Sequence, residues 1–125
     1  MTDEDKNLLE LAAKAAGLKN YRYCPAEDGL HACIEFDDED DCTVVWMPHL
    51  DDGDALRLAA KLNLSICYTL GDINAPWGTA LVGFSPWENA SPIAAVRYQT
   101  HEEKMVATRR AITRAAAEIG KVQQQ

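Results

Sequence analysis

A histidine and three aspartates near the middle of the chain are the first residues whose types and spacing could do chemistry. His49, Asp51, Asp52 and Asp54 follow Pro48, which interrupts an apolar run, and precede a helical pattern. An imidazole and carboxylates at such a junction could bind a divalent metal and support hydrolysis of a phosphodiester or nucleotide. Helix capping explains the aspartates without a ligand, since Asp51 suits the N-cap and the other two suit the positive end of the helix dipole. We expect capping, and a metal-dependent hydrolase is the alternative.

The other acidic and sulfur-bearing groups form no recognised motif. Residues 37–41 (DDEDD) are too charged to be buried, so we expect a solvated hairpin tip. Cys24, Cys33, Cys42 and Cys67 lack the paired ligands two to four residues apart that zinc sites use. We expect buried, reduced thiols and no metal. Cys33 and Cys42 could be neighbours across a hairpin, and a zinc site or a cysteine–histidine nucleophile pair remains open.

Motifs of nucleotide-binding enzymes and hydrolases are absent from the sequence. It contains no GxxxxGK, no GxGxxG, and no serine between the glycines of a nucleophile elbow. We therefore predict neither catalytic residues nor a cofactor.

Aromatic and basic residues give the most specific hypothesis for a binding site. Tryptophans in a Gly- and Pro-rich stretch could stack on a base or anchor a partner, while arginines hold phosphate with forked donors. The alternative is that the tryptophans fill the core and the arginines form a solvated helix face. The candidate binding residues are Trp77, Trp87, Arg97, Arg109, Arg110 and Arg114.

The elements that must position these residues follow from periodicity and caps. Helices are predicted from Thr2 to a stop at Gly17, from an Asp51 cap to Leu62, and from a Thr100 capping box to Gly120. The third helix has a basic strip opposite its apolar side, formed by Lys104, Arg109, Arg110, Arg114 and Lys121. Strands are predicted at 21–24, 31–36, 42–46, 65–70, 79–84 and 93–98, with an irregular loop at 85–92.

This order predicts an α/β (α+β) fold with three helices and a mainly antiparallel sheet of about five to six strands. Most connections are too short for parallel crossovers. We expect an α-β-α sandwich, with a two-layer α+β arrangement as the alternative. Residues 1–121 form one domain, and residues 122–125 read as a frayed C-terminal tail.

Composition narrows the partners and the location. Twenty acidic and twelve basic residues give a net charge of −8, which opposes non-specific binding to DNA and to anionic lipid. No apolar run is long enough to span a membrane, and the acidic start is unlike an export signal. We expect a cytoplasmic protein.

Two segments resemble a known family. Residues 46–58 (WMPHLDDGDALRL) and 107–120 (ATRRAITRAAAEIG) are similar to small phage and prophage proteins of the phage ABA sandwich domain type. Met47 and His49 stand where that family usually carries Asn and Leu. The resemblance spans residues 1–17, 46–62 and 100–121, and it implies helices sandwiching a sheet and a bacteriophage origin.

The resulting hypothesis is a non-enzymatic phage accessory protein with a counter-defence role in the host bacterial cytosol. It would sequester a small nucleotide signal, as a sponge, or inhibit a host defence protein, and act as a homo-oligomer. A structural or regulatory protein that binds another phage protein is a further alternative.

Overall fold

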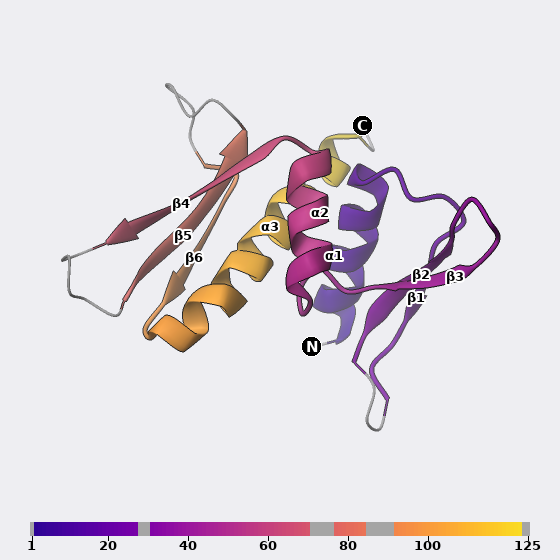
Figure 1. Ribbon diagram of the computed structural model, residues 1–125, viewed down its shortest axis with the longest axis horizontal. Coiled ribbons are helices and arrows are strands. Elements are labelled where there is room, and N and C mark those ends of the chain that lie inside the picture. Colours follow the sequence, from indigo (N-terminus) through magenta and orange to yellow (C-terminus); the bar gives the residue numbers. More distant parts are fainter. Residues whose placement is uncertain (1, 28–30, 71–76, 85–91, 124–125) are drawn as a thin grey trace.

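A computed structural model describes residues 2–27, 31–70, 77–84 and 92–123 of the chain (Figure 1). It confirms the three predicted helices and six predicted strands, with boundaries that differ by no more than a few residues. Trp87 and residues 85–91 of the predicted irregular loop lie outside the described residues. The elements are α1 (Thr2–Ala15), β1 (Arg22–Cys24), β2 (Cys33–Asp37), β3 (Thr43–Trp46), α2 (Asp52–Lys61), β4 (Leu64–Leu70), β5 (Gly78–Phe84), β6 (Ala94–Tyr98) and α3 (His101–Gln123).

The described strands form two antiparallel sheets of three, ordered β1-β2-β3 and β4-β5-β6. This corrects the single sheet of five to six strands, and the expected α-β-α layering is not confirmed. Figure 1 shows the helices gathered between the two sheets. The division into two sheets follows the chain order, because α2 separates β3 from β4. Within each group of three, short connections join consecutive strands, so each strand pairs antiparallel with the next. Apolar residues of both sheets, such as Ile34 and Val82, share one core with the helices.

The contact between α1 and α3 is the most extensive contact between helices in the described part of the chain. Small residues are buried in both elements: Ala12 and Ala13 of α1, Ala16 directly after it, and Ala115 and Ala116 of α3. A Cβ atom at Gly120 would collide with the carbonyl oxygen of Leu11. Because the side chains here are small, the two helix backbones can come into contact. Larger side chains would form ridges that keep the backbones apart.

Local hydrogen bonds end α1 where the sequence predicted. Gly17 has a φ of +76° and its N–H donates to the Lys14 carbonyl at 3.0 Å. The Leu18 N–H donates to the Ala13 carbonyl at 3.1 Å, which completes a Schellman motif. The glycine is needed at this position because a side chain would be strained at positive φ.

The start of α3 is a slightly shifted version of the predicted capping box. Thr100 Oγ1 accepts the Glu103 N–H at 3.2 Å, as expected. The Glu103 carboxylate accepts from the Gln99 N–H at 3.1 Å, one residue before the expected donor.

The acidic segment at 37–41 is an exposed turn, as predicted, although Asp37 still belongs to β2. The Asp38 carboxylate accepts N–H bonds from Asp40 and Cys42, both at 2.9 Å. The Asp38 side chain thus replaces missing backbone partners in the turn. Asp37 contacts Thr43 and Arg22, and all five acidic residues are exposed.

The last helix extends beyond its predicted end. Val122 and Gln123, assigned to a frayed tail, are helical, and Gln124 and Gln125 lie outside the described residues. No helix in the described part of the chain is both long and apolar enough to cross a bilayer.

We expect Gly120→Ala to destabilise the protein by ~1–3 kcal/mol, the usual cost of overpacking a tight contact. The added methyl group would meet backbone rather than a flexible side chain, so the helices must separate. Urea unfolding followed by circular dichroism measures the change.

Gly53→Ala is the matched control, since Gly53 is also helical but the side-chain atoms nearest to its Cβ, on Arg57 and Asp51, lie no closer than 3.2 Å. We expect no loss of stability there. Equal destabilisation of both variants would mean that helix geometry, and not the α1–α3 contact, sets the effect.

Candidate functional site

Asp51 and Asp54 form the joint between β3 and α2. Asp51 is the N-cap of α2, and its Oδ2 accepts the Asp54 N–H at 2.8 Å. Asp54 turns back, and its Oδ2 accepts the Met47 N–H at 2.9 Å while its Oδ1 binds Arg57 Nη2 at 2.6 Å. The predicted capping by Asp51 is confirmed. Both carboxylates are occupied by protein donors that hold the strand end onto the helix.

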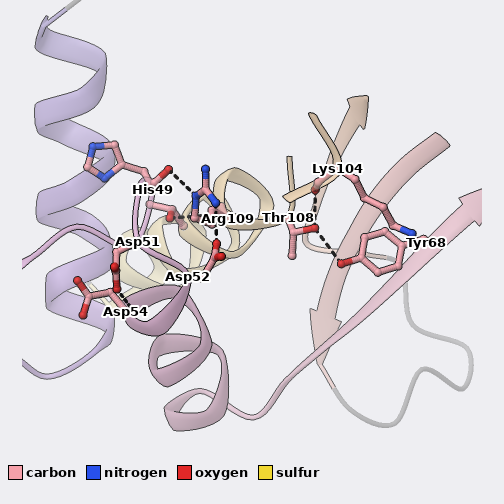
Figure 2. Close-up of polar contacts among 9 residues, drawn as sticks. His49, Asp51, Asp52, Asp54, Tyr68, Lys104, Thr108 and Arg109 are labelled. Atoms are coloured by element: carbon pink, nitrogen blue, oxygen red, sulfur yellow. Dashed lines mark hydrogen bonds and ion pairs between the residues drawn. The ribbon is translucent and has the colours of Figure 1, made fainter. Parts of the chain in front are cut away.

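Asp52 points from the same turn toward α3 and joins the two helices. Its Oδ1 binds Arg109 Nη1 at 2.6 Å, and Arg109 Nε donates to the His49 carbonyl at 3.4 Å (Figure 2). The Arg109 side chain is only 16% exposed. This corrects the prediction that Arg109 belongs to a solvated strip. The cause is tertiary, because α2 packs over this part of α3.

His49 does not join the carboxylates. In Figure 2 its ring is turned toward α1, away from Asp52. Burial is the main reason why its pKa lies below the usual 6.5, and the nearby Arg109 and Arg110 lower the pKa further. The imidazole is therefore neutral at neutral pH, with a buried Nδ1 that has no hydrogen-bond partner among the described residues. The arrangement gives the metal-dependent hydrolase no support.

The predicted binding residues are dispersed over the surface. Trp77 is 49% exposed and directly precedes β5, while Arg97 is exposed on β6 and Arg110 on α3. Arg109 is held by Asp52, and Arg114 lines a different hollow. These residues do not converge on one nucleotide pocket, and Trp87 lies outside the described residues.

An apolar pocket of about 250 Å³ lies between α2, β4 and α3. Its edge carries large side chains that remain accessible: Leu56 is 66% exposed and Met105 47%. Sequence reasoning missed Leu56 and Tyr68. The signal for Leu56 was present, since it lies outside the apolar stripe that buries Ala55 and Leu58. The lining residues are Asp52, Ala55, Leu56, Ile66, Tyr68, Met105, Thr108, Arg109 and Ile112.

Polar contacts fix one wall of this pocket. Tyr68 Oη and Thr108 Oγ1 are 2.8 Å apart, and Thr108 Oγ1 donates to the Lys104 carbonyl at 2.7 Å (Figure 2). The single hydroxyl proton of Thr108 is thus used, so Tyr68 is the donor. Lys104 Nζ lies 4.3 Å from the Tyr68 ring centroid, a cation–π contact. The Tyr68 ring is thus held by a hydrogen bond at its hydroxyl and by Lys104 at its face. These contacts fix the shape of the pocket before any partner binds.

A larger, open groove of about 840 Å³ runs between α1, the start of β6, and α3. It brings Arg114 and Lys121 together with the Tyr21 ring. Lys121 forms an ion pair with Glu118 at 3.1 Å, whereas no described residue pairs with Arg114. This groove is the place where one of the predicted phosphate-binding arginines is available.

The thiols correct two expectations. Only Cys33 is buried, whereas Cys24 and Cys67 are half-buried and Cys42 is exposed. The expected neighbours across a hairpin also differ. Cys33 pairs across the sheet with Cys24, whereas Cys42 lies in the 38–42 turn. Burial raises the pKa of Cys33 to about 11, and the negative charge that Cys24 and Glu35 can carry adds to the rise. At neutral pH this thiol is protonated, which argues against a cysteine nucleophile here.

Comparisons of the chain with protein-family models, curated proteins and solved structures find no match. A function can be inferred from three features: the contacts of Asp51, Asp52 and Asp54 that join β3, α2 and α3, the apolar pocket, and the groove.

Lowering the pH should destabilise the protein through His49. Because burial lowers its folded pKa, the unfolded chain binds a proton at higher pH than the folded chain does. Stability is then lost as the pH falls from about 6.5 toward the folded pKa, and the loss stops below it. Melting temperatures of the wild type should fall more steeply over this range than those of His49→Gln.

His101→Gln serves as the control, because His101 is exposed at the start of α3. It should keep the wild-type pH dependence. If melting temperatures of His49→Gln fell as steeply with pH as those of the wild type, the imidazole would have the same charge in the folded and unfolded states. That result would contradict the prediction.

Proposed function

We propose that the protein is a non-enzymatic binding protein that engages another protein through the apolar pocket between α2, β4 and α3. One observation carries the proposal: Leu56, Tyr68 and Met105 remain exposed around a preformed apolar hollow. Large exposed apolar side chains clustered on rigid elements are typical of interaction surfaces.

The size of the pocket favours a side chain as its occupant. Its volume of about 250 Å³ falls below the ~300–1,000 Å³ of most small-molecule sites. One aliphatic or aromatic anchor of a partner fits such a hollow. The Asp52–Arg109 pair and Lys104 at the edge supply polar contacts around it.

Charge and resemblance indicate the kind of partner. A net charge of −8 favours association with a basic surface. On the resemblance of residues 46–58 and 107–120 alone we further propose a phage accessory protein, with a host defence protein in the bacterial cytosol as its partner class. Another phage protein or a second copy of this chain, as in a homo-oligomer, would use the same anchor-and-pocket contact.

The double variant Leu56→Asp/Met105→Asp should lose its partner while the fold survives, because both side chains are already exposed. A loss of ~30-fold or more in affinity corresponds to the ~2 kcal/mol of a hot spot. Quantitative affinity purification from the bacterial host measures capture, and size-exclusion chromatography reports self-association.

Val122→Asp is the matched control, since Val122 is 70% exposed on α3 and does not line the pocket. Its capture should equal that of the wild type. Capture that survives in the double variant would reject the pocket. The identity of the protein captured distinguishes a host target, a phage target and a second copy.

A small anionic ligand in the larger groove is a second candidate, favoured by Arg114, with which no residue in the described part of the chain forms an ion pair. The groove offers a guanidinium and an aromatic ring to a nucleotide. The carboxylates of Glu10 and Glu118 also line it, and Lys121 is paired with Glu118. We therefore propose Arg114 and Tyr21, instead of Arg109, as the residues that would bind the nucleotide. Arg109 is a poor probe because its removal leaves Asp52 without its partner.

If the groove binds a nucleotide, protein purified from its host should release a small molecule of nucleotide mass on denaturation. Native followed by denaturing mass spectrometry makes this measurement. Arg114→Ala should abolish the co-purifying mass and Arg97→Ala should keep it, since both arginines are exposed and only Arg114 lines the groove. A clean protein mass in the wild type would remove the nucleotide candidate and leave protein binding.

A further inference from the structure

We propose that Cys24, Cys33 and Glu35 form a zinc-binding site on the face of the β1-β2-β3 sheet that turns away from the core. Strand alternation establishes the face. Ile34 is fully buried in the core and Phe36 packs against it, so Cys33 and Glu35 point the other way. Neither the apolar pocket nor the groove includes these residues.

Strand register brings the three ligand atoms together. Cys24 is directly opposite Cys33, and Glu35 follows Cys33 by two residues on the same face. One ligand atom from each side chain lies within 4.8 Å of the others. Ligands about 2.3 Å from one ion in tetrahedral geometry stand roughly 3.8 Å apart, so small side-chain rotations suffice.

Among the residues that the structure describes, this is the one group of three potential metal ligands that lie close enough to bind the same ion. No other set of three histidine, cysteine, aspartate or glutamate side chains there meets the same distance limit, including His49 and the aspartates of the α2 joint. The aspartates of that joint are already bonded to protein donors. The chemistry also differs, because thiolates select zinc and other soft or borderline ions over Mg²⁺ or Ca²⁺.

The surroundings suit an ion with one open position. Cys33 is buried, but Cys24 and Glu35 are partly exposed, so water can complete the fourth position. Two thiolates and a carboxylate around Zn²⁺ leave a net charge of −1. Arg22 Nε lies 3.2 Å from Glu35 Oε1, where it offsets that charge and orients the carboxylate without taking its second oxygen.

Binding should be measured on the reduced, metal-free full-length protein. We expect one Zn²⁺ per chain by competition with a chromophoric chelator, and thiolate-to-metal charge-transfer absorption when Co²⁺ is the probe. Zn²⁺ should also raise the melting temperature, because it clips β1, a strand of only three residues, to β2.

Variants assign the ligands. Cys24→Ser and Cys33→Ser should each weaken Zn²⁺ binding by more than about 100-fold, beyond the ~10–100-fold that follows loss of a supporting group. Glu35→Gln, at a partly exposed position, should weaken binding without unfolding the protein. Cys42→Ser is the matched control: its thiol is exposed in the turn and should leave stoichiometry, spectrum and thermal shift unchanged.

Three outcomes would overturn the site. The wild type could bind no Zn²⁺, or Cys42→Ser could lose binding as fully as Cys24→Ser does. A folded Cys24→Ser/Cys33→Ser protein could retain the ion, which would assign it to histidines or carboxylates elsewhere. Circular dichroism on each variant, together with the Glu35→Gln spectrum, separates loss of ligands from loss of fold.

Discussion

The backbone contact between α1 and α3 is the constraint on which the rest of the structure depends. With no side chain at Gly120, the end of α3 rests on the Leu11 carbonyl, and the alanines on both helices continue this close seam. Once α3 is fixed against α1, it is the element that supports both α2 and the β4-β5-β6 sheet. The first sheet contributes Ile34 and Trp46 to the same core. The two sheets therefore pack against the helices between them and not against each other.

The contacts of Asp52 and Asp54 hold α2 in position and so fix one side of the apolar pocket. Asp54 ties the turn after β3 to α2, and the Asp52–Arg109 pair ties α2 to α3. The wall opposite is held by the bond between Tyr68 and Thr108. Residues that looked most like a metal centre in the sequence therefore act mainly as positioning groups, and the surface that they position is apolar.

Local signals in the sequence predicted most of the elements, because caps and periodicity act within a few residues. The Asp51 cap, the Gly17 stop and the alternation around Ile34 are of this kind. Tertiary relations were not predictable in the same way. The burial of Arg109, the division into two sheets and the pairing of Cys24 with Cys33 depend on register and packing that no single segment specifies.

The position of Leu56 shows how the proposed binding surface differs from the core in the same helix. Ala55 and Leu58 are buried, whereas Leu56 lies toward solvent, where an apolar side chain gains nothing from folding. In the proposed complex, the Leu56 side chain would contribute to stability only when the partner buries it. Because the α2–α3 joint and the Tyr68 contacts already hold the pocket in shape, little conformational entropy is lost when that partner binds. A preformed apolar hollow between α2, β4 and α3 is therefore consistent with the proposed capture of a protein side chain.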